Sequence, residues 1–223
     1  MGTNAAVFFD LDGTLLDTAD DFVLTVEILC DRYEVTPPNA TAIRNTVSDG
    51  ARALVKLAFA CDEDSCDFEP LRNELLTIYE RVLGQQTRLF DGLQDTLYAL
   101  QHLALPWGVV TNKPRRFAAP LMQRMNIQPA AAVLVCPDDV VHTKPHPEPL
   151  YLAAKEVGAR PANCLYVGDH ARDIDAGRNA GMKTIAAAYG YVDDRAETEA
   201  WNADHIIDHG HELQSIIRDL YLP

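Results

Sequence analysis

Short, unbroken apolar runs alternate with longer segments of helical spacing from Phe90 to the end of the chain. The runs typical of strands are residues 107–111, 132–136, 165–167, 184–188 and, with a weaker pattern, 205–207. The segments typical of helices are residues 92–103, 114–125, 147–157 and 173–180. Strands that are apolar along their whole length are buried on both faces, as in a parallel sheet covered by helices. Together with the first apolar run, residues 5–11, the pattern predicts an α/β, Rossmann-like core with a parallel sheet.

The stretch from about Thr18 to Leu89 has a different character. It lacks strand-like runs, and its apolar residues recur at helical spacing, as in Leu71, Leu75 and Ile78. About four helices fit into this stretch. Because it interrupts the core after the first strand, we expect a helical insertion. The predicted division is a core of residues 1–16 and 88–223 with a helical cap of residues 17–87.

Polar side chains follow three of the predicted strands. Asp10 and Asp12 follow the first, Thr111 and Asn112 end the second, and Asp169 follows a later one. In open parallel sheets, ligands bind at the carboxyl ends of the strands. The sequence therefore predicts a site at this edge of the sheet.

Four motifs occur in order along the chain: Asp10-Leu11-Asp12-Gly13-Thr14, Thr111-Asn112, Lys144-Pro145, and Gly168-Asp169 followed by Asp173. Taken singly, each has an ordinary alternative: an acidic turn, a turn after a strand, a solvated lysine, and a helix N-cap with an acidic first turn. Their combination at predicted strand ends and loops favours a catalytic site.

In this order the motifs resemble the four signature motifs of the haloacid dehalogenase (HAD) superfamily, in its phosphatase branch. The resemblance covers essentially the whole chain, including a helical cap after the first motif, as in phosphoglycolate phosphatase-like members. It implies a magnesium-dependent phosphoric monoester hydrolase. Asp10 would be the nucleophile that forms an aspartyl phosphate, and Asp12 would be the general acid and then the general base. Lys144 would keep Asp10 ionised and offset developing charge.

The resemblance also implies a Mg²⁺ site made of oxygen ligands. A carboxylate oxygen of Asp10, the backbone carbonyl of Asp12 and the carboxylate of Asp169 would bind the ion. Asp173 would lie behind them and orient a metal-bound water or Lys144.

The phosphoryl oxygens would be held by the Thr111 hydroxyl and the Asn112 backbone N–H. Four carboxylates and a phosphate dianion carry about six negative charges, against about three positive ones from magnesium and Lys144. Protonated Asp12 still leaves about two, so we expect a further cation from the cap or from residues 113–116. Arg52 is the first cap candidate for binding substrate, and a solvated helix residue is the alternative.

Residues 90–92, 107–114, 116–118 and 136–138 resemble those of N-acetylmuramic acid 6-phosphate phosphatases, which act in peptidoglycan recycling. That amino-sugar phosphate is the preferred substrate hypothesis, and 2-phosphoglycolate is the alternative. A sugar-phosphate mutase of the same superfamily also uses two aspartates and magnesium. A dehalogenase needs neither Asp12 nor the metal site, and a non-catalytic relative usually loses one of the two aspartates. This chain has Asp10, Asp12 and the predicted metal ligands, which disfavours both classes.

Composition limits the partners. A net charge of −14 disfavours nucleic acid and anionic membranes, so the expected partner is a small phosphorylated metabolite. Five cysteines without a C-x-x-C pair, no signal peptide and no long apolar run predict a cytoplasmic protein. His142 and His146 are four residues apart, but Pro145 excludes the helix that would align them for zinc. The oligomeric state is left open.

Overall fold

The predicted parallel sheet is confirmed by the fold. A computed structural model describes residues 4–192 and 194–222. Six strands, all paired in parallel, form the sheet in the order β5-β4-β1-β6-β7-β8. Their bounds are β1 Val7–Phe9, β4 Trp107–Val110, β5 Val133–Val135, β6 Leu165–Gly168, β7 Lys183–Ala187 and β8 His205–Ile207. Since β1 lies between β4 and β6, the three strands followed by the motif residues are neighbours.

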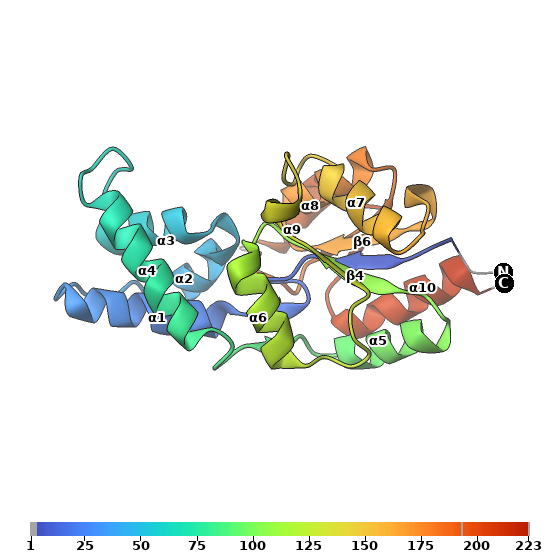
Figure 1. The fold of residues 1–223 in the computed structure, drawn as a ribbon, viewed down its shortest axis with the longest axis horizontal. Coiled ribbons are helices and arrows are strands. Elements are labelled where there is room, and N and C mark those ends of the chain that lie inside the picture. The colour runs from blue at the N-terminus through green and yellow to red at the C-terminus, as the bar shows by residue number, and fades with distance from the viewer. Residues whose placement is uncertain (1–3, 193, 223) are drawn as a thin grey trace. The chain divides into compact units, whose positions relative to one another are not determined.

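Helices cover the sheet on both sides, with α7 and α8 on one side and α5 and α10 on the other (Figure 1). The helices of this part are α5 Leu93–His102, α6 Arg115–Met125, α7 Glu148–Glu156, α8 Ala171–Asn179, α9 Arg195–Ala200 and α10 Leu213–Tyr221. Short 3₁₀ turns are present at Pro137–Asp139, Pro161–Asn163 and Gly210–Glu212. Four of these helices match the predicted segments, whereas α9 and α10 were not predicted. Helix α8 begins at Ala171, two residues earlier than expected.

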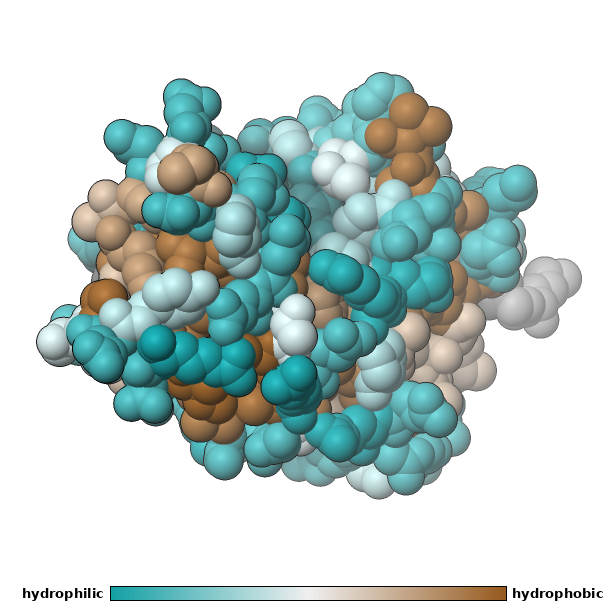
Figure 2. All heavy atoms as spheres, turned by 60° about the vertical axis from the view of Figure 1, so that its left-hand side comes forward, coloured by the Kyte–Doolittle hydropathy of each residue, from teal (hydrophilic) through white to brown (hydrophobic). Residues whose placement is uncertain are grey.

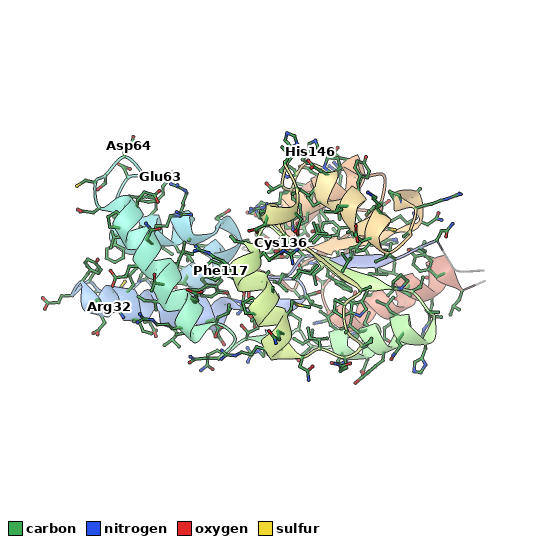
Figure 3. All side chains as sticks on the ribbon, viewed as in Figure 1. Arg32, Glu63, Asp64, Phe117, Cys136 and His146 are labelled. Carbon is green, nitrogen blue, oxygen red and sulfur yellow. The ribbon has the colours of Figure 1, made fainter. Side chains whose placement is uncertain are left out.

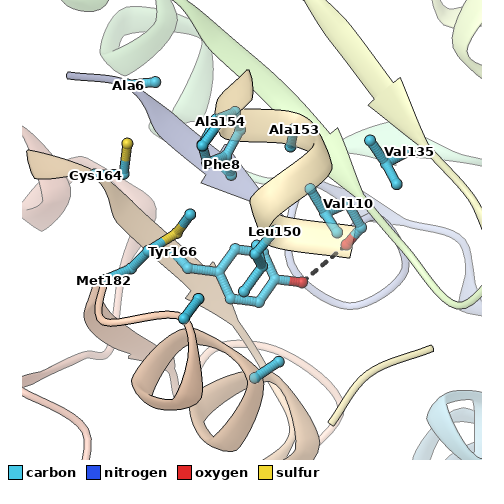
Figure 4. Packing of buried hydrophobic residues seen from close by; sticks show 12 residues of the cluster. Ala6, Phe8, Val110, Val135, Leu150, Ala153, Ala154, Cys164, Tyr166 and Met182 are labelled. Atoms are coloured by element: carbon cyan, nitrogen blue, oxygen red, sulfur yellow. Dashed lines mark hydrogen bonds between the residues drawn. The ribbon is translucent and has the colours of Figure 1, made fainter. Parts of the chain in front are cut away.

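One buried cluster lies between the sheet and helices α7 and α8 (Figure 4). Phe8 and Tyr166 from the strands pack there with Leu150 of α7, and all three are fully buried. The next residue along β1, Phe9, makes an edge contact with Trp107, with ring centroids 6.1 Å apart. Because neighbouring residues of a strand face opposite sides, a continuous apolar run packs against the helices on both faces of the sheet.

Residues Asp17–Arg88 form a second compact unit, and the segments up to Leu16 and from Leu89 form the first. The helices of the second unit are α1 Ala19–Arg32, α2 Ala40–Thr46, α3 Ala51–Phe59 and α4 Phe68–Val82, with a 3₁₀ turn at Val47–Asp49. Phe22 of α1 stacks on Tyr79 of α4 with ring centroids 4.1 Å apart. The α4 stripe that includes Leu75 and Ile78 is buried, as its spacing indicates.

The chain passes between the units at two short strands, β2 Leu16–Asp17 and β3 Arg88–Leu89, which pair with each other. Asp21 in α1 is fully buried and accepts hydrogen bonds from Gly84 N, Gln86 N and the Thr87 hydroxyl, at 2.6–2.7 Å. A buried carboxylate of α1 therefore fixes the segment that follows α4. The role of the second unit as a cap stays a prediction.

The surface in Figure 2 shows hydrophobic side chains among hydrophilic ones. Within the second unit, Tyr33, Val35 and Leu57 are exposed large apolar side chains. Among the described residues, every helix is too short or too polar to cross a bilayer.

Candidate active site

The three motif-bearing strands end side by side. Asp10 follows β1, Thr111 follows β4 and Asp169 follows β6. Asp10 N donates to Val167 O at 2.9 Å, which continues the β1–β6 pairing by one residue. The ladder therefore fixes the backbone from which Asp10 projects, as the strand-end prediction requires.

Lys144 lies between two of the predicted carboxylates. Its Nζ is 2.9 Å from Asp10 Oδ1 and 2.7 Å from Asp173 Oδ1, and its side chain is 1% exposed. The same ammonium donates to Val110 O at 3.1 Å and to the Tyr166 hydroxyl at 2.8 Å. Burial opposes its charge, but the attraction of Asp10 and Asp173 prevails and raises the pKa of Lys144. The lysine thus stays protonated inside the protein.

Asn112 fixes the loop that carries Lys144. Its side-chain amide donates to Lys144 O at 3.0 Å and its side-chain oxygen accepts from Lys144 N at 3.2 Å. From the sequence, a role was predicted for the Asn112 backbone N–H alone, and this contribution of the side chain was not predicted.

Tyr166 was also missed. It lies within β6, where an aromatic side chain is typical of core packing, and it is fully buried. Its hydroxyl donates to Val110 O at 2.8 Å (dashed in Figure 4) and lies 3.3 Å from Asp173 Oδ1. Burial and the nearby Asp173 raise its pKa well above the ordinary value, so the hydroxyl stays protonated as a donor. A tyrosine two residues before the strand-end glycine is the available sequence signal.

The predicted metal ligand Asp169 is held by both carboxylate oxygens. The Thr14 hydroxyl donates to Oδ1 at 2.7 Å and Tyr191 N donates to Oδ2 at 3.1 Å. Asp173 is in the first turn of α8, where its Oδ2 accepts from His170 N at 3.2 Å. Its Oδ1 faces Lys144, so this side chain joins the start of α8 to the buried lysine.

Three of the predicted acids form one cluster. Asp10, Asp169 and Asp173 each place a carboxylate oxygen within 4.8 Å of the others. Burial, opposed by the attraction of Lys144 and assisted by the charge of Asp173, raises the pKa of Asp10 to about 6. Burial, with the charges of Asp10 and Asp173, raises the pKa of Asp169 to about 7. Carboxylates crowded in this way fit a hard cation that prefers oxygen ligands and neutralises them.

Two glycines make room for this cluster. A Cβ at Gly13 would lie 2.1 Å from Asp169 Oδ2, and a Cβ at Gly190 would lie 2.3 Å from Asp169 Cβ. Gly13 also has φ +79°, a backbone conformation that is strained for any residue with a side chain. The glycine of the first motif is therefore required by the tight turn and by the close approach of Asp169.

The Asp12 carboxylate is outside the three-acid cluster and forms an ion pair with Lys113, with Nζ 2.7 Å from Oδ1. Of the cations in residues 113–116, Lys113 therefore contacts a predicted site residue. Arg115 instead pairs with Asp139, and the Arg116 guanidinium lies over the ring of Phe117. Thr111 Oγ1 accepts from Lys113 N at 3.1 Å, which leaves the hydroxyl hydrogen available as a donor.

Arg52 lies in the second unit, at the start of α3. Its guanidinium pairs with Glu63 at 2.9 Å and with Glu69 at 2.8 Å, and it lies 5.6 Å from the ring centroid of Phe68. Glu63 is on the loop between α3 and α4 (Figure 3). These contacts give Arg52 a local role, and its substrate role stays a prediction.

Residues 142–146 form no helix, as Pro145 predicts, but His142 and His146 still lie side by side. Their ring centroids are 4.5 Å apart without a helix, because the loop brings both toward Glu148 at the start of α7. The three side chains are a second group whose ligand atoms lie within 4.8 Å of one another, and Figure 3 labels His146 on this loop. The Glu148 carboxylate accepts from Val141 N, His142 N and His142 Nδ1, and Glu148 N donates to His146 Nδ1. The bond from Glu148 N satisfies the first N–H of α7, and the other three tie the loop to the start of that helix.

Comparison with known proteins gives a consistent picture. A sequence model of the haloacid dehalogenase-like hydrolases matches residues 7–187. An N-acetylmuramic acid 6-phosphate phosphatase of Pseudomonas aeruginosa is 45% identical over 212 residues, which cover 95% of this chain and 94% of that protein. A phosphoglycolate phosphatase of Xanthomonas campestris is 40% identical over 208 residues, covering 93% and 94%. The crystal structure of a predicted phosphoglycolate phosphatase from Haemophilus somnus superposes with a TM-score of 0.82 at 25% identity, covering 97% and 98%.

Proposed function

This chain belongs to the haloacid dehalogenase-like hydrolase family, and from that premise we propose that it is a phosphomonoesterase acting through a phosphorylated Asp10. The observation that carries the proposal is the position of Asp10. Its Oδ1 is 2.9 Å from the buried Lys144 ammonium, and its carboxylate is in one cluster with Asp169 and Asp173. A carboxylate beside a fixed cation and a metal-type cluster is suited to accept a phosphoryl group.

The reaction divides into two balanced steps. In the first, an Asp10 oxygen attacks phosphorus while the ester P–O bond breaks, and Asp12 gives its proton to the leaving alkoxide to form the alcohol. In the second, Asp12 takes a proton from water, whose oxygen attacks the same phosphorus and releases inorganic phosphate. Asp10 returns as a carboxylate and Asp12 as the acid, so no group is consumed.

The other polar groups of the site would bind the phosphoryl group and hold Lys144 in position. The Thr111 hydroxyl and the Asn112 backbone N–H follow β4 at the same sheet edge and would donate to the phosphoryl oxygens. Lys144 keeps Asp10 ionised and close to those oxygens. The side chains of Asn112, Tyr166 and Asp173 hold Lys144 in this position before substrate binds.

Magnesium is the proposed cofactor because the donor set consists of carboxylate oxygens. Asp10 and Asp169 would hold the ion through their carboxylates and Asp12 through its backbone carbonyl, with Asp173 orienting from behind. When bound, the ion would neutralise charge on the phosphoryl oxygens.

The proposed substrate is N-acetylmuramic acid 6-phosphate, with 2-phosphoglycolate as the alternative. Both names occur among relatives that cover most of this chain, at 45% and 40% identity. We place the enzyme in the cytoplasm, and we expect substrate choice to depend on the helical unit as a cap.

A phosphate-release screen tests the proposal. Glycolate, sugar and amino-sugar phosphates would be compared with Mg²⁺ and with EDTA, and with Asp10→Asn as the inactive control. We expect release that needs Mg²⁺ and Asp10, with the highest kcat/KM on the amino-sugar phosphate. A higher kcat/KM on phosphoglycolate would reverse the substrate choice, and conversion of a sugar phosphate to its isomer without phosphate release would indicate a mutase.

A further inference from the structure

A second lysine is buried at the site. Lys113 follows β4, Asp12 follows β1, and the two side chains meet with Nζ 2.7 Å from Oδ1. The lysine side chain is 6% exposed and the aspartate side chain 16%. We infer that Lys113 is a positioning residue that holds the Asp12 carboxylate for its two proton transfers. The inference rests on the proposed function and assigns to that reaction a residue beyond the four motifs.

Burial makes an incidental role for this lysine a poor explanation. A lysine normally keeps its ammonium in water, and a charged group is retained inside a protein when a partner compensates its desolvation. The backbone of Lys113 is anchored, since its N–H donates to Thr111 Oγ1 at 3.1 Å and α6 begins two residues later, at Arg115. The ammonium is therefore held at a rigid strand end, which favours precise placement of its partner.

The two lysines divide the acids of the first motif between them. Lys144 contacts Asp10, and Lys113 contacts Asp12. Asp10 has a further constraint, because Leu11 N donates to its Oδ1 at 2.7 Å. Asp12 comes immediately before Gly13, whose φ of +79° turns the chain. A side chain at such a turn depends on a partner for its orientation, and Lys113 supplies one.

The charge of Lys113 also offsets part of the excess negative charge that the sequence predicts at the site. With Lys113 counted, two lysines and a divalent ion offset all but about one of the charges of the phosphate and the acids once Asp12 is protonated. Backbone donors at Asn112 and nearby can meet that remainder. A lysine from residues 113–116 was one of the two expected sources of this cation.

This role predicts a dependence on the leaving group. An alkoxide needs a proton from Asp12 to depart, whereas p-nitrophenolate departs without one. Misplacement of Asp12 should therefore slow phosphorylation of the enzyme by alkyl phosphates and leave phosphorylation by p-nitrophenyl phosphate nearly intact. The later attack of water needs Asp12 with either substrate.

The experiment compares Lys113→Met and Lys113→Arg with Lys155→Met, which makes the same exchange at an exposed lysine of α7. The two esters are the alkyl phosphate with the highest kcat/KM in the phosphate-release screen and p-nitrophenyl phosphate. We expect Lys113→Met to lower kcat/KM about a hundredfold on the first and less than about threefold on the second. With the latter it should show a burst of one p-nitrophenol per enzyme before a slow steady rate. Lys113→Arg should restore much of the loss, and Lys155→Met should match the wild type.

An equal fall in kcat/KM on both esters, or no fall, would overturn the inference. So would a double variant of Lys113→Met and Asp12→Asn whose loss of transition-state stabilisation equals the sum of the two single losses. Circular dichroism and melting curves check folding, and Lys113→Gln replaces the methionine variant if that one unfolds. If the wild type releases phosphate from neither ester, the proposed function fails first and the inference with it. That result is distinct from a working enzyme in which Lys113→Met is neutral.

Discussion

Replacing Asp169 by asparagine separates two effects of opposite sign in the metal-free protein. Burial and the neighbouring acids raise the pKa of Asp169 from 3.8 to about 7. A carboxyl group with a raised pKa adds stability that is fully present below pH 3.8 and is lost as the pH rises through about 7. Between pH 5 and pH 8, the wild type should lose about 3 kcal/mol from this group, because two pH units separate pH 5 from the folded pKa.

The amide has a fixed cost of its own. Asp169 accepts hydrogen bonds from the Thr14 hydroxyl and Tyr191 N, whereas asparagine offers one acceptor oxygen. One donor is left unsatisfied at either pH, at about 1–3 kcal/mol. We therefore expect Asp169→Asn to be less stable than the wild type at pH 5, and as stable or more stable at pH 8.

Urea unfolding in EDTA at the two pH values measures the effect, with Asp219→Asn as the control that makes the same exchange at an exposed residue of α10. Addition of Mg²⁺ at pH 8 should raise the unfolding midpoint of the wild type and leave that of Asp169→Asn unchanged. A stability difference between variant and wild type that is the same at pH 5 and pH 8 would refute the argument that Asp169 is held in a crowded, desolvated cluster.

Three further substitutions test other contacts. Lys144→Met should abolish turnover and lower the free energy of unfolding by about 3–5 kcal/mol, because it leaves two buried carboxylates uncompensated; a change under about 1 kcal/mol in urea unfolding would contradict this. Gly13→Ala should remove the Mg²⁺-dependent rise in melting temperature, since its Cβ would meet Asp169 Oδ2 at 2.1 Å, and a preserved rise would mean that the turn can move. Arg52→Ala should leave the melting temperature nearly unchanged, because its ion pairs are exposed, and should raise KM for the true substrate if the cap binds phosphate; unchanged kcat and KM would end that assignment.

The sheet and the strand-end acids were predictable because both follow from local patterns. Continuous apolar runs indicated buried parallel strands, and polar residues directly after them placed Asp10, Thr111 and Asp169 at one edge. Helix α10 was readable in principle, since Leu213, Ile216, Ile217 and Leu220 recur at helical spacing. Helix α9 has six residues, among which Thr198 is the buried one, and offers little pattern.

Side-chain partnerships across the chain were beyond the sequence. Lys113 was one of several possible cations until the adjacency of β1 and β4 brought it to Asp12. Tyr166 is typical of a core residue, and its hydrogen bond to Lys144 depends on the path of a loop. His142 and His146 were judged by helical spacing alone, although a loop can join rings that no helix aligns.

Direct capture of the phosphorylated residue tests the central claim. The enzyme would be quenched in acid within milliseconds of mixing with substrate and Mg²⁺, reduced with borohydride, and digested for mass spectrometry. Reduction of an aspartyl phosphate gives homoserine, so we predict homoserine at position 10 when substrate is present and none in its absence. Rapid turnover with aspartate intact at position 10, or a phosphoryl group recovered on another residue, would contradict the account.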